Sequence, residues 1–240
     1  MSSLARRLTL LALVLVAAVF MRLGFWQLGR LEERRTANTA AAQARAEPLR
    51  ELGAGADWTA EELDQRWVEA AGEFDHGHEI VLRGQAFQGT PGVLVVTPLR
   101  LATGDSAVLV LRGFVPSADA VRVDLDSLRE AGRVRVRGLA TAIPSGSGGQ
   151  PLTHDGRTTW ARLDLEALSA RLPYPLLPVL LRQTPDSALT PLPRRLPAPT
   201  LSEGPHLSYA IQWFAFAAMT VVFGWLVVRG RGSPEGSLSP

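Results

Sequence analysis

Residues 209–228 read YAIQWFAFAAMTVVFGWLVV, a run of twenty residues with no charged side chain and no proline. About 20 apolar residues in a helix span the roughly 30 Å hydrocarbon core of a bilayer. Trp213 and Trp225 lie near the two ends of the run, where aromatic side chains meet membrane interfaces. Arg229 and Arg231 follow directly. The sequence therefore predicts a transmembrane helix over residues 209–228.

A second apolar stretch covers residues 8–28 and contains one charged side chain, Arg22. If Arg22 extends to the interface, this stretch spans roughly 31 Å as a helix, which predicts a first transmembrane helix over residues 8–28. The alternative is a cleaved signal peptide, since a basic tip precedes a short apolar core. Bulky residues rather than a polar mature start follow Ala17 and Ala18, and this favours an uncleaved anchor.

Basic residues next to the apolar runs predict the orientation. Arg6 and Arg7 precede the first run and two arginines follow the second, so both termini, including residues 229–240 as a tail, are expected in the cytoplasm. Residues 31–205 are then expected outside. Only seven residues precede the first run, which leaves no room for a mitochondrial transit peptide and indicates a multi-pass protein of a bacterial cell (inner) membrane.

The amino-acid inventory excludes several kinds of chemistry. Cysteine is absent, which excludes a thiol nucleophile, a disulfide and a thiolate metal site. Lysine is also absent from the printed sequence, which excludes a P-loop lysine and a Schiff base. The sequence pI is near 9.8, but the formal net charge is only +2, because few groups titrate between histidine and arginine. No nucleic-acid partner is therefore expected.

Residues 31–205 carry mostly short segments with the two-residue periodicity of β-strands. A polar helix over 31–46, helices at 59–66 and 164–172, and a Pro-rich strap over 184–205 accompany them. The expected strands are 68–72, 79–84, 93–99, 107–113, 133–142, 159–163 and 179–183, with the third and fourth joined as a hairpin. This predicts an α+β membrane protein in which two transmembrane helices flank one β-rich extracytoplasmic domain, an antiparallel sheet or partly closed barrel.

Several polar motifs in this domain have a structural interpretation. Arg133, Arg135 and Arg137 alternate with valines, which predicts a solvated strand face. His76 and His78 flank a glycine and suit a turn better than a metal pair, because no third ligand can be assigned. Ser145–Gly149 is predicted to be a linker rather than a phosphate loop, because the segment contains no lysine and no helix follows it. His154 lies in a turn sequence, and no Gly-x-Ser-x-Gly elbow supplies a nucleophile for it.

His206 is the most informative histidine, because it lies three residues before the second apolar run. If the helix starts there, His206, Tyr209 and Trp213 share one face at i, i+3 and i+7. An imidazole beside aromatic rings at a membrane surface suits haem iron or a carboxylate, and the alternative is a histidine that only caps the helix or reaches the interface. Trp26 and Gln27 end the first run on the same side of the membrane, so they are expected near His206.

Four motifs in this order resemble one known family. They are LGFWQLGR at 23–30, TPL at 97–99, VLRGFVP at 110–116 and PHLSYAIQWF at 205–214. Together they are similar to the surfeit-locus-one (SURF1) family of cytochrome c oxidase assembly proteins, and the resemblance covers nearly the whole chain. Phe114 stands where the family usually has tryptophan, which keeps an aromatic ring but loses an N–H donor.

The resemblance implies a membrane-anchored, non-enzymatic assembly factor, or chaperone, of the respiratory chain. It implies assistance to the insertion of haem a, bound transiently, into the catalytic subunit of the oxidase. The family's histidine before the second anchor falls on His206, the expected ligand of the haem iron. Cofactor contacts are then expected from Tyr209, Trp213, Trp26 and Gln27. The expected partners are the oxidase catalytic subunit, the haem a synthesis enzyme and membrane lipid.

Two other classes of function remain open from the residues alone. A general envelope scaffold would have two membrane anchors and no ligand, and it would not require a histidine and aromatic rings at the membrane edge. An envelope hydrolase or metalloenzyme would require a nucleophile or a set of three ligands, and neither can be assigned in the sequence.

Overall fold

A computed structural model describes residues 3–53, 58–146, 151–154, 157–186 and 189–229. These residues belong to two compact units. The two ends of the chain, up to residue 40 and from residue 201, form the first unit, and residues 41–200 form the second.

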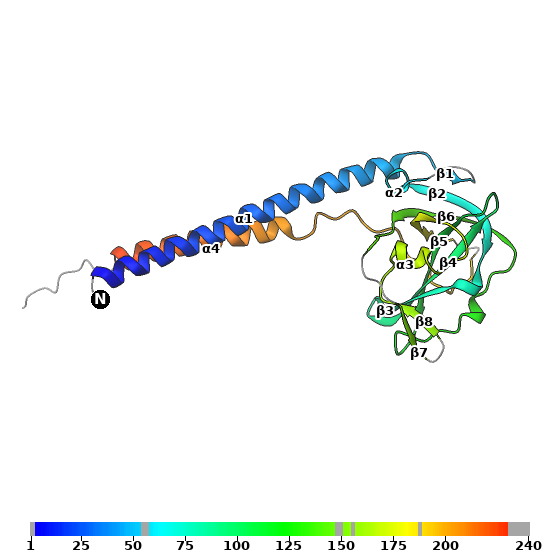
Figure 1. Ribbon diagram of the computed structural model, residues 1–240. Helices are drawn as coiled ribbons and strands as arrows, with labels where there is room; N and C mark the ends of the chain where they lie inside the picture. Colours follow the sequence, from blue (N-terminus) through cyan, green and yellow to red (C-terminus); the bar gives the residue numbers. More distant parts are fainter. Residues whose placement is uncertain (1–2, 54–57, 147–150, 155–156, 187–188, 230–240) are drawn as a thin grey trace, which may run out of the picture. The chain divides into compact units, whose positions relative to one another are not determined.

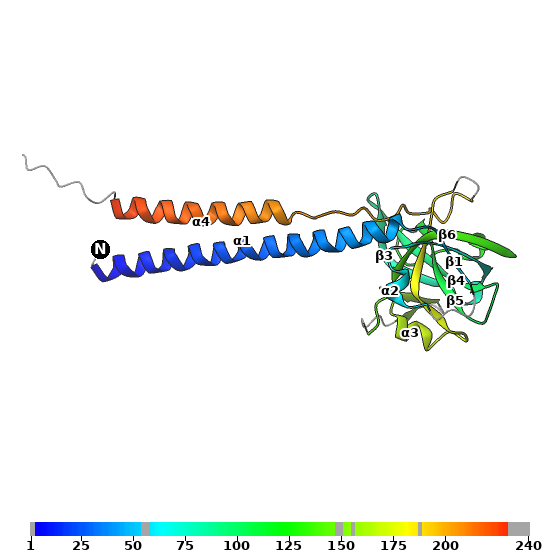
Figure 2. The same cartoon turned by 90° about the horizontal axis from the view of Figure 1, so that it is seen from above.

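The first unit is a pair of long helices. The helices α1 (Ser3–Ala46) and α4 (His206–Arg229) run side by side in Figure 1 and in the turned view of Figure 2. Small or apolar residues recur every seven positions along the contact line between them, as in a coiled-coil seam: Ala17, Gly24 and Leu31 on α1, and Ala210, Ala217 and Gly224 on α4. All six are buried, and a Cβ at Gly24 would lie 2.4 Å from the Phe214 ring. Glycine at this position therefore allows the Phe214 ring of α4 to pack directly against the backbone of α1.

Away from this line the two helices expose apolar side chains. In the most apolar 18-residue stretch of each helix, only 11% of the residues are buried, which is too few for the core helix of a water-soluble protein. Both helices are long and apolar enough to cross a membrane. These features indicate membrane anchoring.

The second unit is built on a closed barrel of five strands, drawn from cyan to yellow in Figure 1. Around the barrel the order is β2 (Trp67–Phe74), β6 (Arg133–Ala142), β9 (Leu176–Gln183), β5 (Ala107–Pro116) and β4 (Thr90–Leu101), and β4 returns to pair with β2. All these pairs are antiparallel except β5 with β9. Because β4 pairs with β2, each of the five barrel strands is hydrogen-bonded to a neighbouring strand on both sides.

Short elements extend this barrel. They are the strands β1 (Arg50–Leu52), β3 (Ile80–Phe87), β7 (Leu152–His154) and β8 (Arg157–Trp160), the helices α2 (Ala60–Leu63) and α3 (Leu165–Ser169), and the 3-10 turns η1 (His76–His78) and η2 (Asp126–Leu128). β3 pairs with β4 and carries β8 on its other edge, while β1 lies parallel to β2.

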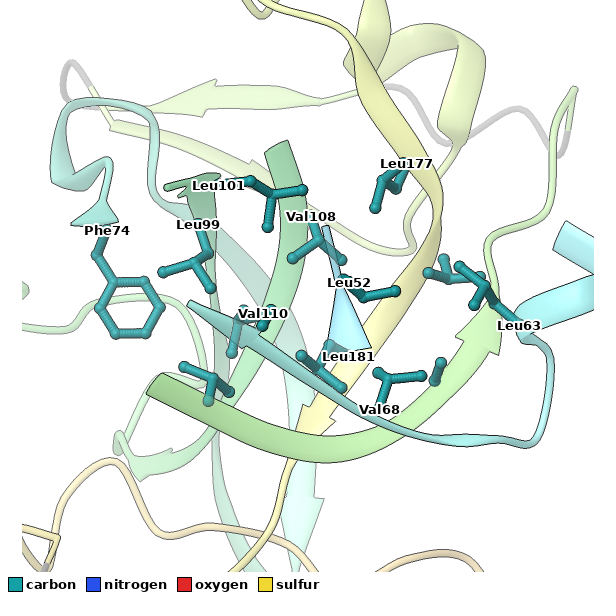
Figure 3. Packing of buried hydrophobic residues seen from close by; sticks show 14 residues of the cluster. Leu52, Leu63, Val68, Phe74, Leu99, Leu101, Val108, Val110, Leu177 and Leu181 are labelled. Carbon is teal, nitrogen blue, oxygen red and sulfur yellow. The ribbon is translucent and has the colours of Figure 1, made fainter. Parts of the chain in front are cut away.

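The core of the barrel is mostly aliphatic, with the Phe74 ring at one side, and is shown in Figure 3. Alternate residues of β5 contribute to two different clusters: Val108 and Val110 point into the barrel, whereas Leu109 and Leu111 pack outside it against β3 and α3. Both faces of β5 are thus covered, which explains why its first half, residues 107–111, is a continuous apolar run instead of an alternating one.

The predicted fold class is confirmed, and so is the hairpin of β4 and β5. The predicted helix at 59–66 forms over Ala60–Leu63 only, with the expected capping box between Thr59 and Glu62. Asp164 caps α3 as predicted, through a hydrogen bond from the backbone of Ala167. The two three-residue strands β1 and β7 were not predicted. The linker predicted at 145–149 lies largely outside the described residues, as does the tail from residue 230.

Candidate functional site

The predicted site histidine lies in the first turn of α4. His206 Nδ1 and Gln27 Oε1 are 2.9 Å apart, so the structure joins α4 to α1 at this point. Gln27 is 9% exposed and faces α4 because it lies three positions after Gly24 on the helix. The expected proximity of His206 and Gln27 is present.

This contact defines which ring nitrogen of His206 carries the proton. A glutamine Oε1 can only accept a hydrogen bond, so Nδ1–H donates and Nε2 of the neutral ring keeps its lone pair. Among the described residues Nε2 has no hydrogen-bond partner. A Cβ at Gly204, whose φ is +72°, would lie 3.6 Å from Nε2. Because position 204 is glycine, no side chain of that residue lies against the Cδ2–Nε2 edge of the ring.

The three predicted aromatic residues occupy different environments. Trp213 stacks on Phe20 with ring centroids 5.7 Å apart, and its indole Nε1 is buried without a hydrogen-bond partner in the described part of the chain. Trp26 and Tyr209 are 57% and 45% exposed, and no hydrogen bond or ring contact joins either of them to His206 in the described structure. His206 and Gln27 thus form the polar centre of the candidate site. Trp26 and Tyr209 expose much of their aromatic rings.

An ion pair that the sequence did not indicate lies within the same helical unit. The Arg35 guanidinium binds the Glu203 carboxylate through two hydrogen bonds of 2.9 and 3.1 Å. The hydrogen bond and charge of Arg35 lower the pKa of Glu203 below its ordinary value. This pair connects the residue before Gly204 to α1. The two residues are 168 positions apart, so no local pattern reveals the pair.

The two histidines of the predicted turn have separate partners, and the turn is confirmed as η1. His78 Nδ1 lies 2.8 Å from Asp75 Oδ2, which also accepts a 2.8 Å hydrogen bond from the Tyr174 hydroxyl. Burial raises the pKa of Asp75, but hydrogen bonds from Tyr174, His78 and Gly77 outweigh it and hold the pKa below its ordinary value. Burial and the Asp75 carboxylate raise the pKa of Tyr174 well above its ordinary value. The phenol therefore stays protonated and suits a structural role better than a nucleophilic one.

A buried charged cluster lies at the barrel wall. Arg112 is completely buried, and it donates to Glu79 Oε1 at 3.0 Å, to Glu130 Oε1 at 2.8 Å and to the Leu128 carbonyl. Arg195 donates to the same Glu130 oxygen at 2.9 Å. Arg112 belongs to the motif at 110–116, and the cluster explains the arginine in that motif structurally. Through Arg112, β5 is linked to Glu79 at the start of β3 and to the segment around η2.

His76 completes this cluster. Its Nδ1 lies 3.0 Å from Glu79 Oε1, and its Nε2 lies within hydrogen-bond distance of the Glu130 backbone. Phe114, from the same motif as Arg112, is 3% exposed and packs against Phe87 with ring centroids 5.7 Å apart. Its side chain fills the core.

The arginines of β6 form the predicted solvated face. Arg133, Arg135 and Arg137 are exposed, and the register places Glu73 opposite Arg133 and Glu69 opposite Arg137. Such cross-strand charge pairs suit a surface in water.

Comparison with known proteins gives a consistent result. The sequence pattern of the SURF1 family matches residues 14–218. A "SURF1-like protein" of Monosiga brevicollis is 30% identical to the chain over 95% of it and 90% of that relative. An "uncharacterized SURF1-like protein" of Mycobacterium tuberculosis (strain H37Rv) is 26% identical over 96% of the chain and 89% of that relative, and one of Mycobacterium bovis matches to the same extent.

Proposed function

The chain belongs to the SURF1 family, known generally as cytochrome c oxidase assembly factors, and we propose that it assists the insertion of haem a into the catalytic subunit of the oxidase. The observation that carries the proposal is the His206 ring, whose Nδ1 is held by Gln27 and whose Nε2 is open. A neutral imidazole nitrogen is a common axial ligand of haem iron.

The residues around His206 fit such a cargo. A bound haem supplies an iron that accepts one nitrogen lone pair, and Nε2 offers one. Gln27 orients the ring and raises the basicity of the ligating nitrogen, as outer partners of metal-bound histidines do. Trp26, Tyr209 and Trp213 would contact the flat, apolar part of the cargo.

One protein nitrogen suits a carrier. Cytochromes c, which keep their haem, hold the iron with two side chains, a histidine and a methionine. His206 would hold a bound haem through one nitrogen, so transfer to an acceptor protein would require only one protein–iron bond to break. The catalytic subunit of the oxidase and the haem a synthesis enzyme are the proposed partners for unloading and loading.

For the orientation in the membrane, we propose both termini in the cytoplasm of a bacterial cell and residues 31–205 outside, because the arginine pairs flank both apolar helices. Alkaline phosphatase, which is active only outside the cytoplasm, reports the side of the membrane on which it is placed. The enzyme is expected to be active when inserted after Ser145 and inactive when fused after Arg229. The opposite pattern at either position contradicts this orientation.

Purification of the full chain from cells that make haem a tests the proposed function. The expected result is a visible spectrum with haem a bands, and the pyridine haemochrome identifies the haem type. A chain that purifies without haem, while the same cells contain assembled oxidase, favours the general envelope scaffold instead.

A further inference from the structure

A hollow of about 400 Å³ lies within the second unit, at the edge formed by β3, β8 and the segment around η2. Its volume falls in the range of small-ligand sites, about 300–1,000 Å³. The residues that line it with polar or charged groups are His76, Glu79, Asp124, Asp126, Arg129, Thr158 and Thr159. The proposed haem function uses none of these residues.

Glu79 is the buried acidic group of this hollow. Its side chain is only 2% exposed, yet it lines the hollow. His76, Thr97 and Arg112 all contact the same oxygen, Oε1, at 3.0, 2.8 and 3.0 Å. The second oxygen, Oε2, has no hydrogen-bond partner among the described residues. Oε2 is not one of the fully buried polar atoms of the described chain, so the small exposed part of the Glu79 side chain leaves this oxygen within reach of a donor from outside the chain.

The charges around the hollow favour a cation. Three carboxylates line it, against one guanidinium: Arg129 pairs with Asp126 at 2.8 Å, and the buried Arg112 behind the wall pairs with Glu79 at 3.0 Å. Asp124 therefore has no ion-pair partner among the described residues. Arg83, a further arginine near the lining, donates to the Thr159 carbonyl at 2.9 Å.

The shape and walls favour an organic cation over a metal ion. Val81, Val121 and Val123 supply an apolar wall, on which an alkyl stem can pack. Within the part of the chain that the structure describes, no three His, Asp or Glu side chains are grouped so that they could hold a metal ion.

We propose that this hollow binds an alkylguanidinium or alkylammonium group, with an N–H donating to Glu79 Oε2 and the alkyl stem against the valines. The same chemistry can come from a free small cation or from an arginine or lysine side chain of a partner polypeptide. The site goes beyond the proposed haem function and does not depend on it.

The test compares butylguanidinium with butylurea, an uncharged analogue of similar shape, by calorimetric titration of the full chain in non-ionic detergent. Butylguanidinium is expected to bind at least about tenfold more tightly, because a hydrogen bond to a charged group is worth more than a neutral one. Equal affinity of the two probes, or no binding of either, overturns the proposal. The peptide N-acetyl-Gly-Arg-Gly-amide identifies the source: tighter binding than butylguanidinium assigns a polypeptide partner, and weaker binding assigns a free cation.

Two variants locate the site. Glu79→Gln is expected to weaken butylguanidinium binding by about tenfold or more. Val121→Phe, which narrows the hollow without changing a charged group, is expected to do the same and remains informative if Glu79→Gln does not fold. Glu73→Gln, an exposed carboxylate of β2 away from the hollow, is the matched control and should leave the affinity unchanged. Full affinity in Val121→Phe contradicts the assignment.

Discussion

The His206→Ala chain is expected to purify with less than about a tenth of the haem a that the wild-type chain carries, because the substitution removes the nitrogen that we propose binds the iron. The α4 helix that follows His206 keeps its apolar sequence, so the protein level in the membrane should not change. The measurement is the haem a content per chain from the pyridine haemochrome. A wild-type haem content in His206→Ala would assign His206 to a capping or interfacial role.

His78→Ala is the matched control for this experiment. His78 is a partly exposed histidine of the second unit, and its partner is Asp75. Its removal should leave the haem content unchanged. His76 would be a poor control, because it is bound to Glu79 in the buried cluster.

Gln27→Leu separates orientation of the ring from ligation. This variant keeps the size of the side chain but removes the acceptor of the Nδ1 proton, and losses of such outer partners typically cost 10–100-fold in affinity. Gln27→Glu restores an acceptor oxygen and should recover haem binding relative to Gln27→Leu. Equal haem content in both variants would mean that Gln27 only packs between the helices.

The second large effect is expected from Arg112→Ala, which should lower the free energy of unfolding by about 3–5 kcal/mol, because Glu79 and Glu130 would lose a buried cationic partner. The measurement is denaturant unfolding of the full chain in detergent, followed by tryptophan fluorescence. Arg135→Ala is the control: this arginine is 68% exposed and pairs with Glu69, so its loss should cost about 0–1 kcal/mol. Equal costs for the two variants would contradict the structural role of the Arg112 cluster.

The sequence predicted the parts of the fold that follow from regular patterns. The two apolar helices and most strands have clear hydrophobic periodicity, and Thr59 and Asp164 carry recognisable caps. The strands β1 and β7 were missed because three residues are too few to show alternation. Barrel closure depends on the pairing of β2 with β4, a tertiary contact that no local pattern specifies.

The candidate site was predictable only in part. His206 and Gln27 were expected to be close because Gln27 lies at the end of the first apolar run and His206 just before the second, on the same side of the membrane. The roles of Gly204 and of the pair between Arg35 and Glu203 depend on distances in the folded chain. Arg112 is the clearest case of a hidden role, because arginine is usually a surface residue and only the structure reveals its burial.

Deletion of the gene tests the central claim most directly. The claim is that this chain assists haem a insertion into cytochrome c oxidase, so the reduced-minus-oxidised spectrum of membranes should lose haem a absorbance while the haem b bands remain. Oxidase turnover should fall in parallel, and the wild-type gene, but not the His206→Ala variant, should restore both. Unchanged haem a absorbance and oxidase turnover in the deletion strain would contradict the account.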